Sequence, residues 1–362
     1  MPHNKASKIT LALPFSGPLA EAAKAIREGF MAAYYEHRSK HNEQALTIRF
    51  FDTNKTDIKS IYQTSPTRSQ LTKENSSELV IGPLDKPTLK ELDKIDHISI
   101  PTIALNSPTL PSARENLFTL SYAPESEAEI IIKHLVKEGI TNTGVLIPAT
   151  AYGYRMLSAL ESSSIDYSTK IITTSEYTDD VSVSKAIAEL LSTLDSKQRS
   201  RKIRNIIGQN VISTPRPRKD LDAIIMIAEP EIAKQIKPLL AFNYSSDLPV
   251  YASSLVNQAA FLDRGHDLNG VIFPDMPWML SDAIDTKQNI ARNLPNKSRI
   301  YSRFYAIGVD TFSLAPRIHL LAAVKNSQMQ GVTGTLSISE HNTFQRDLTW
   351  ATFNKGKIIR IR

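Results

Sequence analysis

Apolar and polar residues follow a repeated order along this chain: a short apolar run, a turn, and then apolar positions at helical spacing. The first example begins with the apolar residues 9–13 and passes through a turn that holds two prolines and a glycine. In positions 19–34 apolar side chains then recur every three or four residues. Pro18 suits the first turn of a helix, because its missing N–H would have no partner there. This segment predicts a strand, a tight turn and an amphipathic helix.

The same order recurs in two series that divide near residue 122. Apolar runs predict further strands at 46–51, 79–81, 100–105, 144–147, 171–174, 224–227 and 250–252. Helical spacing predicts helices at about 86–95, 125–138, 181–194 and 231–241, and another after Tyr152 and Gly153. Alternation of strands and helices is typical of parallel sheets with helices on both faces. The chain is therefore predicted to be an α/β protein.

The last hundred residues have a different pattern. Residues 268–278 predict an extended apolar connector, and 299–324 predict a helix that is interrupted at Pro316. Antiparallel strands are expected at 335–338 and 348–353, and the second is followed by a turn and a final strand. At 362 residues the chain is too long for one ordinary core, so we expect two lobes.

Composition excludes several classes of protein. Hydrophobic residues make up 41% of the chain and charged residues 22%, which is typical of a globular protein. No apolar run approaches the roughly 18–20 residues that a membrane-spanning helix needs, and the first residues lack the apolar core of a signal peptide. The chain has no cysteine, so it holds no disulfide, thiolate metal site, cysteine nucleophile or lipid-bearing cysteine.

The formal charge of +6 comes from one segment. Removing its eight basic residues from the 43 Lys and Arg leaves 35, against 37 Asp and Glu. The eight, with no acidic residue among them, are Lys197, Arg199, Arg201, Lys202, Arg204, Arg216, Arg218 and Lys219. They are either the solvated face of a helix over 198–207 with the loop that follows, or a patch for an anionic partner. Nucleic acid is disfavoured, because the segment lacks aromatic residues and any nucleic-acid motif.

A search for chemistry finds no catalytic motif. The chain has no GxGxxG, GxxxxGK[ST] or GxSxG, and its 13 glycines are few for phosphate-binding loops. His37 and His41 have a spacing that can bind a metal on one helix face, but there is no third ligand and Arg38 stands where the HExxH motif has glutamate. The acidic residues 125, 127 and 129 fit the start of a helix. We therefore expect no catalytic residue, metal or cofactor.

The loops after the strands are the candidate binding site, because ligands of doubly wound sheets lie beyond the carboxyl ends of the strands. Their hydroxyl groups and free helix N-termini suit a carboxylate or similar polar group. The same residues also serve as ordinary turn and capping residues, and this interpretation stays open. The candidate cleft residues are Phe15, Ser16, Gly17, Gly82, Pro83, Asn106, Ser107, Tyr122 and Tyr152.

The order of the predicted elements resembles the type I periplasmic-binding-protein fold, in which the chain crosses three times between two doubly wound lobes. This resemblance implies one lobe of 8–122 plus 266–330 and a second of 123–265 plus 331–362. More specific phrases are similar to the C-terminal domain of the LppC lipoproteins, a family of penicillin-binding protein activators. The similarity runs from about residue 8 to 361 and includes PFSGPLAEAAKAIREGFMAAYY, VIGPLDKPTLKEL, RPRKDLDA, DLPVYASS and DMPW.

That resemblance implies a regulator of peptidoglycan synthesis that is not an enzyme. Members of the family are lipoproteins on the periplasmic face of the outer membrane of Gram-negative bacteria, and they bind and activate a class A penicillin-binding protein. The chain is expected to be the C-terminal domain alone, because it holds neither the lipid-bearing cysteine of the family nor its helical N-terminal domain. Peptidoglycan is a second candidate partner, whereas nucleic acid and a membrane span within this chain are not expected.

The resemblance gives no partner site residue by residue. The candidate partner-contacting residues are therefore taken from the basic segment: Arg201, Lys202, Arg204, Arg216, Arg218 and Lys219. Two alternatives stay open. The chain could be a receptor for an amino-acid-like ligand or a muropeptide, although no charged pair stands ready for an α-amino group. A hydrolase of cell-wall material is disfavoured by the absence of a catalytic constellation.

Overall fold

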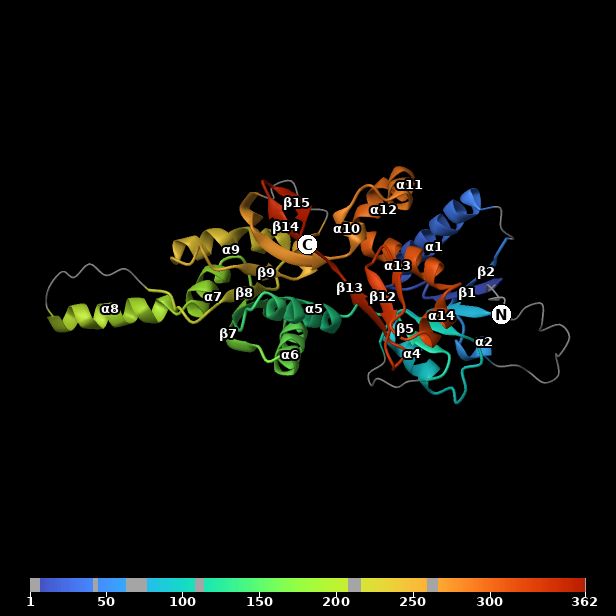
Figure 1. The fold of residues 1–362 in the computed structure, drawn as a ribbon, viewed down its shortest axis with the longest axis horizontal. Coiled ribbons are helices and arrows are strands. Elements are labelled where there is room, and N and C mark those ends of the chain that lie inside the picture. The colour runs from blue at the N-terminus through green and yellow to red at the C-terminus, as the bar shows by residue number, and fades with distance from the viewer. Residues whose placement is uncertain are drawn as a thin grey trace. The chain divides into compact units, whose positions relative to one another are not determined.

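The computed structural model describes residues 7–41, 45–62, 77–107, 114–207, 216–258 and 266–361 (Figure 1). The chain folds into two compact units, which we call unit 1 and unit 2. Unit 1 holds Met1–Ala123 and Met276–Leu348, and unit 2 holds Pro124–Asp275 and Thr349–Arg362. The chain therefore passes from one unit to the other three times, as the predicted fold class requires.

Unit 1 is built on a parallel sheet of five strands in the order β2-β1-β3-β4-β5. The strands are β1 (Lys8–Leu13), β2 (Thr47–Asp52), β3 (Leu79–Ile81), β4 (Thr102–Ala104) and β5 (Leu117–Thr119). Because side chains alternate across a strand, Ile9, Leu11 and Leu13 enter the core on one face, while Ala12 lies in the core on the other. Both faces of the sheet are thus buried, which explains the nearly continuous apolar runs.

The helices of unit 1 cover these two faces. The helices α1 (Ala20–Lys40) and α13 (Ser302–Leu314) pack against each other over one core, and α2 (Lys59–Tyr62) and α4 (Lys86–Asp93) cover the other. The remaining helices are α10 (Pro277–Leu280), α11 (Asp285–Asn293), α12 (Pro295–Ile300) and α14 (Ile318–Ala323). The predicted break of the long helix at Pro316 is confirmed, since α13 ends at Leu314 and α14 begins at Ile318.

A small antiparallel sheet completes unit 1. Its strands are β11 (Gln328–Gln330), β12 (Thr335–Ile338) and β13 (Phe344–Asp347), in that order. Leu336 and Phe344 reach the same core as β1, and a bridge between Thr119 and Thr343 ties this sheet to the end of β5.

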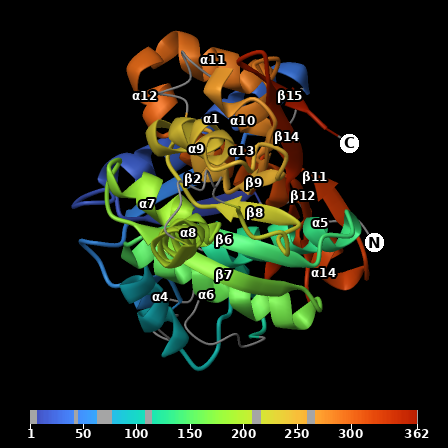
Figure 2. The ribbon, with the colours of Figure 1, turned by 90° about the vertical axis from the view of Figure 1, so that its left-hand side faces the viewer.

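Unit 2 is built on a seven-stranded sheet in the order β15-β14-β10-β9-β8-β6-β7. The strands are β6 (Asn142–Pro148), β7 (Lys170–Tyr177), β8 (Ala223–Met226), β9 (Val250–Ala252), β10 (Val271–Asp275), β14 (Thr349–Asn354) and β15 (Lys357–Arg360). Five strands are parallel, β14 pairs antiparallel with β10, and β15 pairs antiparallel with β14 to form the expected terminal hairpin. Strands β7, β6, β8 and β9 can be followed in Figure 2.

The helices of unit 2 are α5 (Pro124–Lys137), α6 (Ala151–Asp166), α7 (Ser182–Leu190), α8 (Thr193–Ile207), α9 (Pro230–Phe242) and the short 3-10 helix η1 (Ser254–Val256). Helices α5 and α6 pack over Val145, Ile147 and Ile225 of the sheet. Helix α6 begins earlier than the sequence predicts, because Thr150 caps it by accepting a hydrogen bond from Gly153 N–H over 3.2 Å.

The division of the chain differs from the predicted lobes at two segments. Residues 266–275 belong to unit 2, because β10 pairs with β9 on one side and with β14 on the other. Residues 331–348 belong to unit 1, because β12 and β13 pair with each other and pack on its core. In the first segment one strand partner, β14, lies far along the chain, whereas the strands of the second segment pair with each other and are assigned to unit 1 by their packing on its core.

One carboxylate at the start of the unit 2 sheet gives a testable pH dependence. Asp222 Oδ2 accepts hydrogen bonds from Asn142 N–H over 2.8 Å, from Thr141 N–H over 3.1 Å and from the Thr141 hydroxyl over 3.0 Å. These hydrogen bonds hold the pKa of Asp222 below its ordinary value, and the bond from the Asn142 amide has the largest effect. A carboxyl group whose pKa is lower in the folded state stabilises the fold above its unfolded pKa, and this contribution disappears as pH falls through the folded pKa.

We therefore expect Asp222→Asn to reduce the free energy of unfolding at pH 7 by about 1 kcal/mol, since the side chain is exposed and screened. Urea unfolding at several pH values measures this. The difference from the unaltered chain should shrink as pH falls below the ordinary carboxyl value of 3.8. The exposed Asp166→Asn is the control and should change stability by less than about 0.5 kcal/mol. A deficit that is constant with pH would contradict the assignment.

Candidate functional site

The predicted cleft residues of unit 1 follow the carboxyl ends of its parallel strands, so they lie along one edge of the sheet. Phe15 follows β1, and its ring meets the ring of Phe50 edge to face, with the centroids 6.1 Å apart. The guanidinium of Arg27 lies 5.8 Å from each of the two ring centroids. The aromatic face of Phe15 is thus used within unit 1 as a cation–π partner.

The loop of Ser16 and Gly17 is closed by a side chain that the sequence analysis did not identify. Asn54 donates a hydrogen bond from Nδ2 to the carbonyl of Ser16. Gly17 adopts a φ of +76°, and a Cβ at this position would lie 3.0 Å from Asn54 Nδ2. Glycine is therefore favoured here by its backbone conformation, and a larger residue would also require the Asn54 amide to shift.

The two loops after β3 and β4 are joined by hydrogen bonds. Pro83, which follows a cis peptide bond from Gly82, accepts a bond from Leu105 N–H over 2.9 Å. Asn106 Nδ2 donates to the carbonyl of Leu84 over 2.9 Å, and Asn106 Oδ1 accepts from Ser107 N–H over 2.9 Å. Gly82 and Pro83 are buried. The amide of Asn106, the group best suited to hold a ligand here, is already used to position its own loop.

Tyr122 lies between two arginines of unit 1. Arg303 donates a hydrogen bond from Nη1 to the Tyr122 hydroxyl over 2.9 Å, and its guanidinium is 5.6 Å from the ring centroid. The guanidinium of Arg346 is 5.3 Å from the same centroid. Tyr122 is the last but one residue before the chain leaves unit 1 for the first time. Its ring therefore holds this end of the segment in place.

Tyr152 belongs to unit 2 and lies in the first turn of α6, where it is exposed. Its neighbours on this helix make polar contacts within unit 2. Tyr154 donates its hydroxyl to Glu176 over 2.8 Å, and Arg155 binds both carboxylate oxygens of Glu125 at 2.5 and 2.8 Å. The predicted cleft residues are thus gathered along the sheet edge in unit 1, while Tyr152 lies in the other unit.

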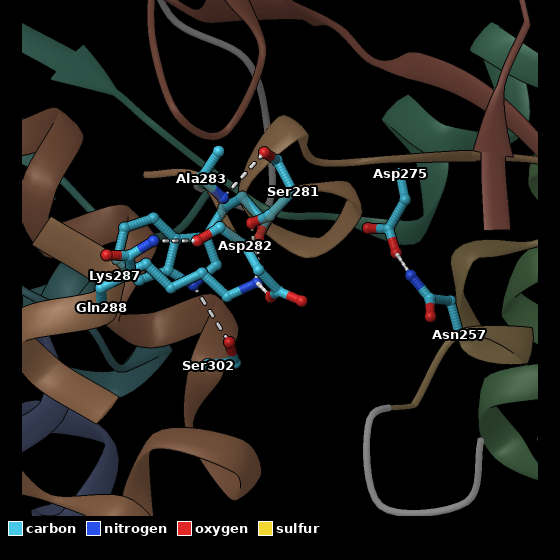
Figure 3. A network of polar contacts seen from close by, with 9 residues as sticks. Asn257, Asp275, Ser281, Asp282, Ala283, Lys287, Gln288 and Ser302 are labelled. Atoms are coloured by element: carbon cyan, nitrogen blue, oxygen red, sulfur yellow. Dashed lines mark hydrogen bonds and ion pairs between the residues drawn. The ribbon is translucent and has the colours of Figure 1, made fainter. Parts of the chain in front are cut away.

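Further polar groups hold the segments at the second of the three crossings, where the chain passes from unit 2 to unit 1 (Figure 3). In unit 2, Asn257 donates to Asp275 over 2.8 Å, and both are buried. In unit 1, the Lys287 ammonium donates to the carbonyls of Trp278 and Ser281 and to the Asp282 carboxylate, at 2.8, 2.9 and 2.8 Å. These groups are engaged with the chain itself, so they are structural contacts.

A buried pair of charged residues in unit 1 was also missed by sequence reasoning. Asp310 of α13 accepts hydrogen bonds from Val332 N–H, Thr333 N–H and the Thr333 hydroxyl at 2.7, 2.8 and 2.5 Å. Burial raises the pKa of Asp310, although the three donors and the charge of Arg346 act in the opposite direction. Burial likewise lowers the pKa of Arg346, whose Nε and Nη2 find no hydrogen-bond partner among the described residues.

The basic segment lies in unit 2 and begins in α8. Arg199, Arg201, Lys202 and Arg204 are exposed, and within the described ranges none of them forms an ion pair. Residues 216–219 continue the segment beside the first turns of this helix. Arg216 N–H donates to the Ser196 hydroxyl, and Arg218 N–H donates to the Leu191 carbonyl, both over 2.9 Å.

Arg218 differs from the cations of α8, because it has an acidic partner within the described residues. Arg218 binds Asp220 through Nε and Nη2 at 2.7 and 2.8 Å, so its charge is neutralised locally. The hydrogen bond to Asp220 is the main cause that raises the pKa of Arg218, and burial acts in the opposite direction. The side chain of Lys197 and the loop residues 208–215 lie outside the described residues, whereas Arg216 and Lys219 are exposed.

The two histidines with the spacing of a metal site lie close together near the end of α1. The rings of His37 and His41 lie 4.6 Å apart. Within the described ranges no three histidine, aspartate or glutamate side chains gather as a metal site would require. None of the helices in the same ranges is both long and apolar enough to cross a membrane.

Comparison with solved structures confirms the fold class. The chain resembles the C-domain of LpoA (YraM) from Haemophilus influenzae, described as a regulator of PBP1A, with a TM-score of 0.73 and 23% identity, over 98% of this chain and 100% of that one. It also resembles a "putative branched-chain amino acid ABC transporter" from Chromobacterium violaceum, with a TM-score of 0.68 and 24% identity, over 96% of this chain and 99% of that one. The architecture is thus the type I periplasmic-binding-protein-like fold.

Comparison of sequences identifies the family. The chain is 28% identical over 351 residues to the penicillin-binding protein activator LpoA of Vibrio cholerae serotype O1, and the alignment covers 96% of this chain and 57% of that protein. The chain thus spans a little over half the length of this relative. The family described as "LppC putative lipoprotein" matches residues 1–356. The chain belongs to this LppC family.

Proposed function

We propose that this chain binds a class A penicillin-binding protein and stimulates its synthesis of peptidoglycan. The observation that carries the proposal is the alignment of 96% of the chain with a relative that is named an activator of a penicillin-binding protein. The fold that it shares with a regulator of PBP1A supports the same function. In this proposal the chain performs no catalysis of its own.

Activation by contact requires a difference in affinity. A bound protein shifts an equilibrium only if it binds the active conformation of the synthase more tightly than the resting one. A tenfold shift toward the active state needs a tenfold ratio between the two affinities, which is about 1.4 kcal/mol. A modest interface is therefore enough, provided that it forms fully only on the active synthase.

The location of the protein is part of the proposal. Membership of a family of lipoproteins supports a place in the cell envelope. We propose the periplasmic face of the outer membrane of a Gram-negative bacterium, with the lipid anchor on a part of the protein outside this chain. Peptidoglycan itself is proposed as an additional ligand, since an activator at this place would meet the polymer that its partner makes.

Two surfaces are candidates for the contact with the synthase, namely the sheet edge of unit 1 and the basic segment of unit 2. The main polar groups described on the sheet edge are used within unit 1, as Asn106 and the Ser16 carbonyl are. The exposed cations of α8 have no such internal partner among the described residues. We therefore place the contact at the basic segment. The use of these polar groups within unit 1 also counts against the cleft as a receptor site for a small ligand.

A binding measurement tests the proposal. The purified chain is immobilised and an intact class A synthase from the same organism is passed over it at increasing concentration. Saturable binding is the expected result, and it should weaken as salt is raised because exposed cations contribute to it. Serum albumin, which is acidic but unrelated, serves as the control for non-specific attraction. Absence of saturable binding at any salt concentration would refute the proposal.

A further inference from the structure

Two side chains near the beginning of α8 attach this helix to unit 2. The Thr193 hydroxyl donates to Asn243 Oδ1 over 2.8 Å in a buried contact, and the Ser196 hydroxyl accepts from Arg216 N–H. Beyond these residues the side chains of 201–206 are all exposed. Figure 1 shows α8 extending away from α7 and α9, and Figure 2 looks along its axis. The second half of the helix is thus unpartnered within the described part of unit 2.

This exposed half carries two large apolar side chains. Ile203 is 51% exposed and Ile206 is 83% exposed. Residues three apart lie on the same side of a helix, so the two isoleucines form one ridge, which we call the isoleucine ridge. A soluble helix normally turns such side chains toward its own core. Here the ridge faces away from any core that the structure describes, which is a recognised mark of an interaction site.

Cations border the isoleucine ridge. Arg199 is one turn before Ile203 on the same face, and Lys202 lies on one flank of the ridge. Given the period of an α-helix, Arg204 lies about 100° to the other side of Ile203 and about 160° from Ile206. All three are exposed, and none forms an ion pair with a described residue. A ridge with such a border fits an apolar groove whose rim carries carboxylates. Helix-in-groove binding of this kind is a common mode of recognition.

We propose that α8 is a docking helix whose isoleucine ridge enters an apolar groove, bordered by Asp or Glu, on a partner protein. The proposal rests on the proposed function, which makes that partner the class A synthase. A protein groove fits better than a lipid surface for two reasons. Arg201 lies opposite the ridge, so the cations surround the helix rather than lining one polar face. The exposed half also lacks the aromatic residues that usually accompany membrane-surface helices.

Two variants and two matched controls test the docking helix. The first variant, Ile203→Ser with Ile206→Ser, removes the ridge. Its control is Ile165→Ser with Val181→Ser, two side chains of unit 2 that are 80% and 81% exposed. The second variant, Arg199→Glu with Lys202→Glu and Arg204→Glu, reverses the charges. Its control makes the same change of charge at Lys355, Lys357 and Arg360, exposed residues of the terminal hairpin in the same unit.

Affinity for the immobilised synthase is then measured over a range of salt concentrations. Each α8 variant should bind at least tenfold more weakly than the unaltered chain, and each control should stay within twofold. The charge variant should also lose most of the salt dependence, whereas the ridge variant should keep it, because only the former removes the ion pairs. Circular dichroism should show unchanged folding for all four, since every altered side chain is exposed.

The outcomes separate this inference from the proposed function. If the unaltered chain does not bind the synthase, both fail. If it binds and the α8 variants bind equally well, the function stands and the docking helix is overturned. A parallel measurement uses vesicles that contain phosphatidylglycerol. If the α8 variants lose only vesicle binding and keep synthase binding, the helix serves a lipid surface and the inference is likewise overturned.

Discussion

Replacing Gly308 by alanine is expected to lower the free energy of unfolding by about 3 kcal/mol, the upper range for overpacking a core. In an ordinary exposed helix the same change stabilises by about 1 kcal/mol, because glycine costs more backbone entropy than alanine. The sign reverses here because of packing. A Cβ on Gly308 would lie 2.0 Å from the Ile26 carbonyl oxygen and 2.7 Å from Phe30 N. These are backbone atoms of α1, which cannot turn away as a side chain can.

The same contact is built from both helices. A Cβ on Gly29 of α1 would lie 2.1 Å from the Tyr305 carbonyl oxygen of α13. The two glycines thus let α1 and α13 approach closely over the main core of unit 1, so one methyl group would force the helices apart. Urea unfolding followed by circular dichroism measures the effect. Arg38→Ala, an exposed change on α1, is the control and should alter stability by less than about 0.5 kcal/mol. If Gly308→Ala were as stable as the unaltered chain, this packing would be wrong.

Removing the carboxylate of Asp310 should cost about 3–5 kcal/mol. Three donors, from Val332 and Thr333, would be left without their acceptor in a buried place. The buried Arg346 would also lose the negative charge that favours its own charged form. Asp310→Ala therefore leaves three buried donors without an acceptor and removes the negative charge that stabilises the Arg346 cation. Unit 1 should unfold at a clearly lower urea concentration.

The matched control for Asp310→Ala is Asp282→Ala. Asp282 also binds a cation, Lys287, over 2.8 Å, but its side chain is 99% exposed. A surface ion pair contributes about 0–1 kcal/mol, so this variant should stay close to the unaltered chain. Equal losses for the two variants would mean that the burial of Asp310 does not determine its contribution. Asp310→Asn should fall between them, because its amide oxygen can still accept from the Thr333 or Val332 donors.

The fold class was predictable because the signal is local. Strands that are buried on both faces, such as β1 and β8, appear in the sequence as apolar runs. Pro316 likewise predicts the break between α13 and α14. The boundaries between the units were not predictable in the same way. The apolar run of β10 suits a strand, but the choice of β9 and β14 as its neighbours depends on residues far along the chain.

The partners of the polar groups at the candidate site could not be predicted from the sequence either. The sequence places small and polar residues after each strand, and the structure puts those of unit 1 at the sheet edge. Whether a polar group there is free depends on partners that the pattern does not reveal, such as Asn54 for the Ser16 carbonyl and the Leu84 carbonyl for Asn106. A helical projection of α8 could have grouped Ile203 with Ile206. That this face has no core to pack against among the described residues is evident only in three dimensions.

The rate at which a class A synthase makes peptidoglycan decides whether this chain is an activator of that enzyme. The purified synthase is supplied with its lipid-linked disaccharide precursor, and glycan polymerisation and peptide cross-linking are followed with increasing amounts of this chain. We expect the rate to rise and to saturate over the same concentrations at which binding saturates. The α8 variants should need at least tenfold more protein to reach half of the effect. An unchanged rate at concentrations that saturate binding would show that this chain binds the synthase without activating it, and would overturn the proposed function.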